Sequence, residues 1–396
     1  MTMAATFESR SAYSRAGSGA IKVACVDIIR DMARAESVWR ACETAGYLAT
    51  PYQRFDLLDA WQRNVGTHEG VEPFIVVATD RAGDTLLLLP LATRHENGAN
   101  VARFLGGKHT TYNLGLWRSD FAAAATRDDL DVILSAGAAN GIDVLALTQQ
   151  PRRWRGIANP LLAYPSQLSP NDCPLLKLTP GAKPETNIST GFRRRLRSKE
   201  RKLQTLPGFR YRIASSDDEI SRLLNIFFTI KPLRMAAQNL PNVFADPGVE
   251  QFVRAACLAK VPDGGRAITI HALECDQEMI AIFAGVDGGD RFSMMFNTYT
   301  MSENAKQSPG VVLVRDIIDH YAAKNYVAFD LGIGADEYKR QFCKDDEPIF
   351  DSYIPLTARG KFAALGMSSL TRAKRIVKHS PALMQIAQQL RAMLHH

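Results

Sequence analysis

The chain of 396 residues lacks several patterns that would place a protein in a familiar class. It has no apolar run of about eighteen residues, so we expect no membrane-spanning helix. Its six cysteines form no Cys-x-x-Cys pair, which indicates reduced thiols rather than a disulfide framework. Residues 1–20 lack the apolar segment of a signal peptide and are predicted to be a flexible tail. These absences together predict a cytoplasmic protein.

Common catalytic and metal-binding signatures are also missing. The sequence has no Gly-x-Ser-x-Gly elbow, no P-loop and no His-Glu-x-x-His helix. His271 and Cys275 are four residues apart but have no further ligands near them, so we expect no metal site. Gly332-Ile-Gly334 lacks the third glycine of a dinucleotide fingerprint. Cys343 has no evident histidine partner, which argues against a thiol nucleophile.

Composition indicates a globular protein of two domains. Apolar residues make up 46% and charged residues 22% of a chain that is long for one hydrophobic core. The net charge of +7 favours an anionic partner: nucleotide phosphates, an acidic polymer or an anionic membrane. The alternative is a surface that is simply basic. No aromatic residues are interleaved with the basic ones in the manner of a sequence-specific nucleic-acid binder, so we expect no DNA partner.

The predicted elements repeat along the chain. Strand, helices, antiparallel meander, helix and strand follow one another within 21–147 and again within 211–331. We therefore predict an α/β protein with two tandem domains, each a mixed, mainly antiparallel sheet flanked by helices. The predicted parts are a flexible tail 1–20, an N-terminal domain 21–180, a C-terminal catalytic domain 181–358 and a basic helical tail 359–396.

The strongest functional signal lies between the strand predicted at 291–299 and the helix predicted at 309–324. Ser308 is placed to cap that helix, Pro309 suits its first turn, and Gly310 permits close approach of a ligand. The free N–H groups and the dipole of such a helix start attract phosphate, although capped helices are common. The candidate cofactor-binding residues are Gln307, Ser308, Pro309, Gly310 and Val311.

This order of elements resembles that of N-acyltransferases that use acyl-CoA. Gln307 and Gly310 match their Gln/Arg-x-x-Gly-x-Gly/Ala pyrophosphate loop, whereas Val312 replaces its final small residue. Segments 308–310, 329–334 and 338–339, with the basic run 191–197, are similar to the acetyltransferase-like family associated with bacterial cellulose and exopolysaccharide biosynthesis, the CelD/BcsL type.

The resemblance implies tandem domains of the GNAT (acyl-CoA N-acyltransferase) fold, akin to Fem-type peptidyltransferases, with acyl-CoA (acetyl-CoA) as co-substrate. Tyr338 stands where superfamily members often have a tyrosine that protonates the departing thiolate. Asp330 is the candidate proton acceptor and Lys339 the candidate ligand for an anionic acceptor or phosphate. The alternative is that Tyr338 packs and Asp330 caps a turn. Backbone N–H groups of 291–299 would hold the oxyanion.

Seven Lys or Arg residues occur within 193–202, against the single acid Glu200. Phe192, Leu196 and Leu203 give this predicted helix a thin apolar face. The run is either a solvated helix face or a site for phosphates of an anionic acceptor. The candidate substrate-binding residues are Arg193, Arg194, Arg195 and Arg197.

We therefore expect acyl transfer to an amine or hydroxyl of a small molecule, sugar or cell-envelope precursor, with polysaccharide-synthesis machinery as a partner. The alternatives are Fem-type transfer from aminoacyl-tRNA and a non-catalytic subunit of a polysaccharide-synthesis assembly. From Arg359 onward the chain has no acid, and two helices are predicted around Ser380-Pro381. The apolar stripe of the second either packs on the protein or docks weakly on an anionic membrane. That stripe comprises Leu383, Ile386, Ala387, Leu390 and Leu394.

Overall fold

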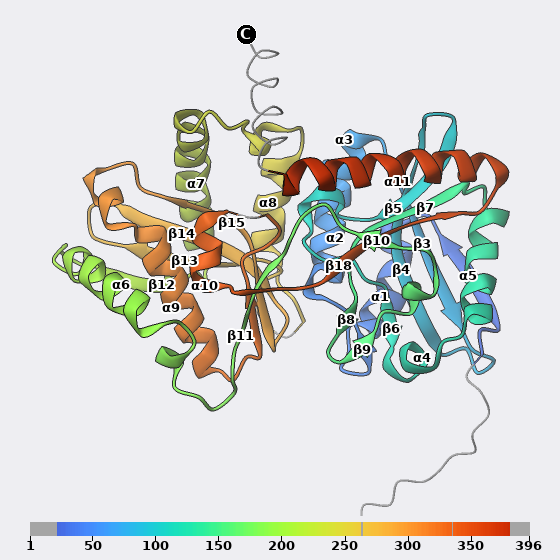
Figure 1. Cartoon of the computed structure of the whole chain (residues 1–396), viewed down its shortest axis with the longest axis horizontal. Coiled ribbons are helices and arrows are strands. Elements are labelled where there is room, and N and C mark those ends of the chain that lie inside the picture. Colours follow the sequence, from blue (N-terminus) through green and yellow to red (C-terminus); the bar gives the residue numbers. More distant parts are fainter. Residues whose placement is uncertain (1–21, 263, 335, 381–396) are drawn as a thin grey trace, which may run out of the picture.

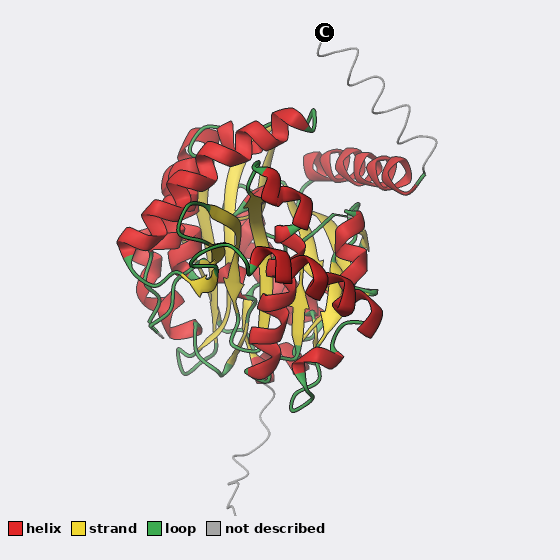
Figure 2. Ribbon diagram, turned by 90° about the vertical axis from the view of Figure 1, so that its left-hand side faces the viewer, coloured by secondary structure: helices red, strands yellow, loops and turns green. Residues whose placement is uncertain are grey.

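The computed structural model describes residues 22–262, 264–334 and 336–380. The predicted tail 1–20 and the second predicted tail helix lie outside the described residues. Two α/β halves lie side by side (Figure 1), with strands in the interior and helices around them (Figure 2). None of the described helices combines enough length with enough apolar sequence to cross a bilayer.

The N-terminal half is built on a sheet in which only β5 and β7 run parallel among the principal strands. Its order is β1 (Cys25–Ile29), β3 (Glu72–Thr79), β4 (Thr85–Glu96), β5 (Ala99–Phe104), β7 (Val144–Pro151), β18 (Ile349–Pro355) and β10 (Gln167–Leu168), with β6 (Leu116–Arg118) and β2 (Tyr47–Leu48) attached beside β4. Its helices are α1 (Met32–Cys42), α2 (Phe55–Trp61), α3 (Thr67–Glu69), α4 (Ser119–Ala124) and α5 (Arg127–Ala139), and β8 (Arg153–Trp154) and β9 (Ile157–Ala158) form a separate hairpin.

The C-terminal half repeats this plan, with β15 and β16 as its parallel pair. Its sheet order is β12 (Arg210–Ile213), β13 (Thr269–Glu274), β14 (Met279–Asp287), β15 (Arg291–Tyr299), β16 (Ala328–Asp330), β11 (Pro174–Lys177) and β17 (Asp345–Asp346). Its helices are α6 (Thr190–Leu203), α7 (Asp217–Ala237), α8 (Val249–Leu258), α9 (Pro309–Ala323) and α10 (Glu337–Phe342).

The predicted repeat of strand, helices, meander, helix and strand is confirmed in both halves. One helix of the N-terminal half is irregular. It begins at Phe55 and passes at Gln62 into a wider π turn that ends at Gly66. Such a turn inserts one residue into the helical ladder, which periodicity alone does not reveal.

The two sheets exchange segments, so the chain does not divide at one position near 180 or at 358. β11 pairs with β16 of the C-terminal sheet, although it precedes that half. β18 follows the C-terminal half but pairs with β7 of the N-terminal sheet. The long helix α11 (Ala358–His379) then packs on β18, β7 and β5. Each half thus completes its sheet with a strand from beyond the expected boundary.

A shared hydrophobic core joins the halves. One cluster contains buried side chains of both, among them Leu58 and Phe104 with Phe227, Phe252 and Phe296. A second cluster fills the space between the C-terminal sheet and helices α6 and α9. Because the first core spans both halves, residues of the N-terminal half are held against the C-terminal sheet.

Candidate active site

The parallel strands β15 and β16 part at the centre of the C-terminal half. They pair only from Arg291↔Ala328 to Ser293↔Asp330, after which β16 ends while β15 continues to Tyr299. A bulge in β15 leaves Met295 without a partner on β14, and such an extra residue is unpaired in the ladder. Two cavities flank this free part of β15.

The first cavity, which we call the α9 cavity, has a volume of about 200 Å³ and lies beside the start of α9. Its lining includes the hydroxyl-bearing Thr298, which is 1% exposed and has no hydrogen-bond partner for Oγ1 among the described residues. Thr298 pairs with Ile282, so its side chain lies on the opposite face of the sheet from Asn297 and Tyr299 and does not point into this cavity. The lining residues are Phe283, Asn297, Thr298, Tyr299, Ala305, Ser308, Gly310, Val311, Val314 and Tyr338.

The predicted phosphate turn forms one wall of this cavity, but Ser308 does not cap α9 as expected. Its backbone is left-handed, with φ of 50°, and its side chain makes no cap hydrogen bond. The Ser308 hydroxyl instead accepts a hydrogen bond from Lys199 Nζ at 2.5 Å. Lys199 lies on α6, so the structure brings a cation to the positive end of the α9 dipole. Sequence analysis did not single out this lysine, although it lies in the basic run.

Gly310 and its neighbours lie at the N-terminal end of α9. A Cβ on Gly310 would lie 3.3 Å from Tyr299 Cδ1, so the helix start and β15 approach closely. Gln307 ends the short 3-10 turn before α9 and Pro309 is the first helical residue. The amides of Val311 and Val312 donate to the Ser308 carbonyl.

Tyr338 lies on α10 and its side chain lines the α9 cavity. Its hydroxyl accepts from Asn297 Nδ2 at 3.2 Å and donates to Met294 Sδ at 3.8 Å. Burial raises the pKa of Tyr338 above that of an ordinary tyrosine, so the phenol stays protonated at neutral pH. A protonated phenol whose proton is held only by a thioether sulfur is suited to donate to a second sulfur.

Asp330 is fully buried at the end of β16, and its oxygens already have partners. Arg291 Nε donates to its carboxylate at 2.9 Å, and the Ser293 hydroxyl donates at 2.5 Å. The Gly332 amide donates to the other oxygen at 3.1 Å. This environment is that of a structural carboxylate, and it matches the alternative in which Asp330 holds a turn.

Lys339 is 3% exposed and holds the loop that follows β16. Its ammonium donates to the carbonyls of Ile333 at 2.9 Å and Gly332 at 3.4 Å, and lies 3.4 Å from Asp336. Gly332 has φ of 70°, and a Cβ there would lie 3.0 Å from the Met294 carbonyl. The hydrogen bonds of Lys339 and the missing side chain of Gly332 thus keep this loop close to β15.

The four predicted substrate-binding arginines do not form one site. Arg193 is 7% exposed and makes a two-point ion pair with Asp319 on α9, at 2.6 and 2.7 Å. Arg194, Arg195 and Arg197 are exposed on α6. The apolar face of this helix was predicted correctly, since Phe192, Leu196 and Leu203 are buried. Because Lys199 contacts the start of α9, the basic helix lies on the side of the α9 cavity.

The second cavity, which we call the interdomain cavity, has a volume of about 280 Å³ and lies on the other side of β15. Its walls are mainly apolar, and the N-terminal half supplies four consecutive polar residues. Sequence analysis missed this wall because no local motif marks it. The lining residues are Lys108, His109, Thr110, Thr111, Val243, Phe244, Val249, Phe252, Val253, Met294, Met295, Phe296, Leu331, Gly332, Ile333 and Lys339.

His109 is a neutral hydrogen-bond donor in this cavity. Trp61 Nε1 donates to His109 Nδ1 at 3.0 Å, and an indole can only donate, so the proton of the neutral ring is on Nε2. Burial, with a smaller effect of Lys108, lowers the pKa of His109 to about 4. The imidazole is therefore uncharged at neutral pH.

The parallel pair of the N-terminal half, β5 and β7, is also short, from Val101↔Val144 to Ala102↔Leu145, and leaves a gap beyond it. The chain after β5 fills the gap: the Asn113 amide donates to the Gln149 carbonyl, and Gln149 Nε2 donates to the Thr110 carbonyl. The helix that follows, α5, carries Asp128 and Asp129 in its first turn, which disfavours phosphate. Residues 108–111 of this chain segment also form the polar wall of the interdomain cavity.

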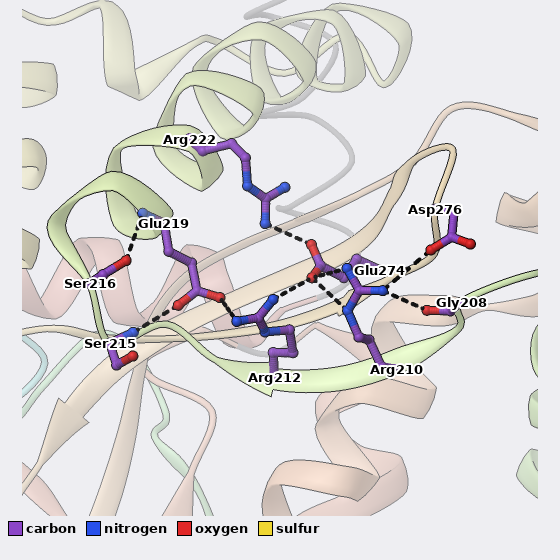
Figure 3. Close-up of polar contacts among 9 residues, drawn as sticks. All are labelled: Gly208, Arg210, Arg212, Ser215, Ser216, Glu219, Arg222, Glu274 and Asp276. Carbon is purple, nitrogen blue, oxygen red and sulfur yellow. Dashed lines mark hydrogen bonds and ion pairs between the residues drawn. The ribbon is translucent and has the colours of Figure 1, made fainter.

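A cluster of arginines at the edge of the C-terminal sheet forms its ion pairs with acidic residues of the same chain (Figure 3). Arg210, Arg212 and Arg222 surround the Glu274 carboxylate at 2.7–3.4 Å, and Arg212 also pairs with Glu219. These contacts tie the edge strand β12 to β13 and α7. Within the described residues, no three or more His, Cys, Asp or Glu side chains converge as metal ligands.

Comparison with known proteins agrees with this geometry. Residues 190–340 match the family model described as "Acetyltransferase (GNAT) domain". No curated protein matches the sequence. Among solved structures, the fold is similar to a crystal structure of FemX, with a TM-score of 0.56 at 8% identity, covering 83% of this chain and 98% of that one.

Two further crystal structures are similar over most of their length. A conserved protein of unknown function from Bacteroides thetaiotaomicron has a TM-score of 0.53 at 9% identity, covering 83% of this chain and 100% of its own. The C-terminal domain of a putative lysylphosphatidylglycerol synthetase from Agrobacterium fabrum has a TM-score of 0.50 at 12% identity, covering 85% and 97%. At such identities the likeness concerns the fold alone. Residues 190–340 thus match a GNAT acetyltransferase domain, and the chain as a whole shares its two-part α/β fold with the crystal structure of FemX.

Proposed function

We propose that the protein transfers an acyl group, most simply acetyl, from acyl-CoA to an amine or hydroxyl group. One observation carries the proposal: adjacent residues of α10, Tyr338 and Lys339, line the two cavities on either side of the parted strands. A donor in the α9 cavity and an acceptor in the interdomain cavity would meet across the free part of β15. Such a meeting of reactants on a fixed scaffold is the main requirement of acyl transfer.

The α9 cavity has the groups that acyl-CoA requires. The positive end of the α9 dipole and the Lys199 ammonium suit the pyrophosphate. The thioester would then extend toward Tyr338, where β15 and β16 part.

In the proposed reaction the acceptor nitrogen or oxygen attacks the thioester carbonyl. Backbone N–H groups at the β15 bulge, beside Met295, stabilise the oxyanion. Collapse of the tetrahedral intermediate breaks the carbon–sulfur bond, and Tyr338 donates its proton to the departing thiolate. The acceptor's proton passes to solvent, from which Tyr338 is reprotonated. Asp330 positions β16 through Arg291 and Ser293 rather than acting as a base.

The acceptor that this geometry favours has a polar reacting group on an apolar body. Val243, Phe244 and Phe252 line one side of the interdomain cavity, and Lys108 and His109 lie among its polar groups. A sugar or cell-envelope precursor with an apolar substituent, handled in the cytoplasm by polysaccharide-synthesis machinery, meets this description. Screening amines and hydroxyls of envelope sugars with acetyl-CoA, and following thiol release, would test it.

Transfer from aminoacyl-tRNA is the second candidate, favoured by the exposed basic face of α6. Titration calorimetry with CoA and with aminoacyl-tRNA separates the two. Tight CoA binding without tRNA binding supports the first candidate, and the reverse result supports the second. A folded protein that binds neither would instead be the non-catalytic subunit.

Gly310→Val is expected to weaken CoA binding at least about tenfold, which corresponds to about 1.4 kcal/mol. A Cβ at Gly310 already lies 3.3 Å from Tyr299, so the added methyl groups must enter the space of the pyrophosphate. The matched control is Gly191→Val, because Gly191 is also the second residue of its helix and a Cβ there meets nothing within 4 Å. Unchanged CoA affinity by calorimetry in folded Gly310→Val would contradict the proposed donor site.

Lys199→Gln is expected to raise KM for acyl-CoA about tenfold, because a charge-assisted hydrogen bond contributes about 1.5–3 kcal/mol. KM for the acceptor should not move, and the salt dependence of donor binding should flatten. Arg197→Gln on the exposed face of α6 is the matched control. Equal effects of both substitutions would indicate a long polyanion along α6, as the tRNA-dependent alternative requires.

A further inference from the structure

Helix α11 packs through its small residues and turns its large apolar residues outward. Gly360, Ala364 and Thr371 are its buried residues, and Ala364 joins a small cluster formed with β5 and β7. A surface helix in water normally shows the opposite arrangement, with large apolar side chains toward the core. The outward residues are Phe362, exposed by 80%, Leu365 by 69%, Ile376 by 62% and Leu370 by 56%.

The orientation of α11 is determined by contacts at its start. The Thr357 side chain caps the helix by accepting from the Gly360 amide, and its hydroxyl donates to Asp143 Oδ1 at 2.5 Å. A Cβ on Gly360 would lie 1.8 Å from the Asp143 carbonyl, so only glycine permits this approach. The helix cannot rotate to bury Phe362 without losing these contacts.

The exposed apolar stripe is surrounded by positive charge. Residues 358–379 contain six Lys or Arg residues and no acid. Arg372 donates to Gln167 Oε1 at 2.9 Å and Arg375 to the Ser169 carbonyl at 2.5 Å. Both acceptors are uncharged, so these two contacts do not neutralise Arg372 or Arg375. The six residues are Arg359, Lys361, Arg372, Lys374, Arg375 and Lys378.

A second exposed apolar segment is the connection between α7 and α8, which lies at the upper end of the molecule in Figure 1, as α11 does. In this connection Leu240 is 52% and Val243 is 48% exposed, and Val243 also lines the interdomain cavity.

We propose that the outward face of α11 docks flat on an anionic lipid surface. Apolar side chains flanked by Lys and Arg are the features by which a helix lies in a membrane interface. Anionic headgroups complement the charge, whereas a second copy of the chain would bring its own α11 cations against these. The segment 381–396 contains no acid either, so it offers no complementary charge.

Sedimentation of the full chain with vesicles tests the proposal. Binding is expected to vesicles containing phosphatidylglycerol, to weaken as salt is raised, and to be nearly absent with phosphatidylcholine alone. The double substitution Phe362→Ser and Leu365→Ser should lower the binding constant about tenfold or more, because both side chains would enter the interface. Its thermal unfolding should match the wild type, since both side chains are exposed in the folded chain.

The control pair is Val132→Ser and Val327→Ser, whose side chains are exposed by 49% and 47% on other elements. This pair should leave vesicle binding unchanged. Absence of binding to anionic vesicles at low salt would overturn the proposal. So would unaltered binding of the Phe362/Leu365 variant combined with loss of binding in Leu383→Ser/Ile386→Ser, which would assign docking to 381–396. A self-association that the Phe362/Leu365 variant abolishes, without vesicle binding, would show that a second copy covers the stripe.

Discussion

Tyr338→Phe is expected to lower kcat about a hundredfold while acyl-CoA affinity is retained, because general acid catalysis contributes about this factor. The substitution removes only the hydroxyl, which accepts a hydrogen bond from Asn297 and donates one to Met294 Sδ. Without it the thiolate must leave unprotonated or take a proton from water. The measurement is the rate of thiol release at saturating acyl-CoA, with the best acceptor from the screen.

The structure changes the pH dependence expected for this variant. From sequence alone, the substitution should remove a basic limb of the pH–rate profile. Burial raises the pKa of Tyr338, and an acid with a raised pKa stays protonated up to that higher value. The wild type should therefore show no basic limb from Tyr338 below about pH 10, the ordinary tyrosine value.

Tyr353→Phe is the control for losing one tyrosine hydroxyl outside the two cavities. The Tyr353 hydroxyl forms a hydrogen bond with Thr371 of α11. It should leave kcat unchanged. Should Tyr338→Phe keep full kcat with the same acceptor, Tyr338 is not the acid and solvent protonates the thiolate.

Asp330→Asn is expected to lower the free energy of unfolding by about 3 kcal/mol, because it removes one partner of a buried ion pair. Arg291 is 6% exposed and, among the described residues, would keep Glu347, at 2.7 Å, as its remaining ion-pair partner. It also donates to the Tyr112 hydroxyl at 2.5 Å and lies over Trp154, so it links the two halves. Urea denaturation measures the loss.

Asp290→Asn is the matched control, because Asp290 and Arg155 also form a two-point ion pair but their side chains are 35% and 43% exposed. A partly exposed pair contributes about 1 kcal/mol or less. The same experiment separates the two roles considered for Asp330. Unaltered stability of Asp330→Asn together with loss of the acidic limb of kcat would restore the proton-acceptor role.

The sequence determined the local elements and the α9 turn. Helical periodicity and the Pro309 start place α9 within one residue of its observed end at Ala323, and the turns around β15 place that strand at its observed bounds. Phe192, Leu196 and Leu203 mark the buried face of α6 by their spacing. These features depend on residues within a few positions of one another, so a single sequence contains the information.

Tertiary structure decided which segments meet. The exchange of β11 and β18 depends on open sheet edges, and strand patterns do not specify which edge a strand joins. The buried partners of Asp330 lie up to 39 residues away, and the His109 wall lies in the other half of the chain. Long-range pairing thus made Asp330 and Arg193 structural and brought Lys199 to the donor turn. Desolvation and ion pairing act through space, so these roles follow from contacts that no local pattern encodes.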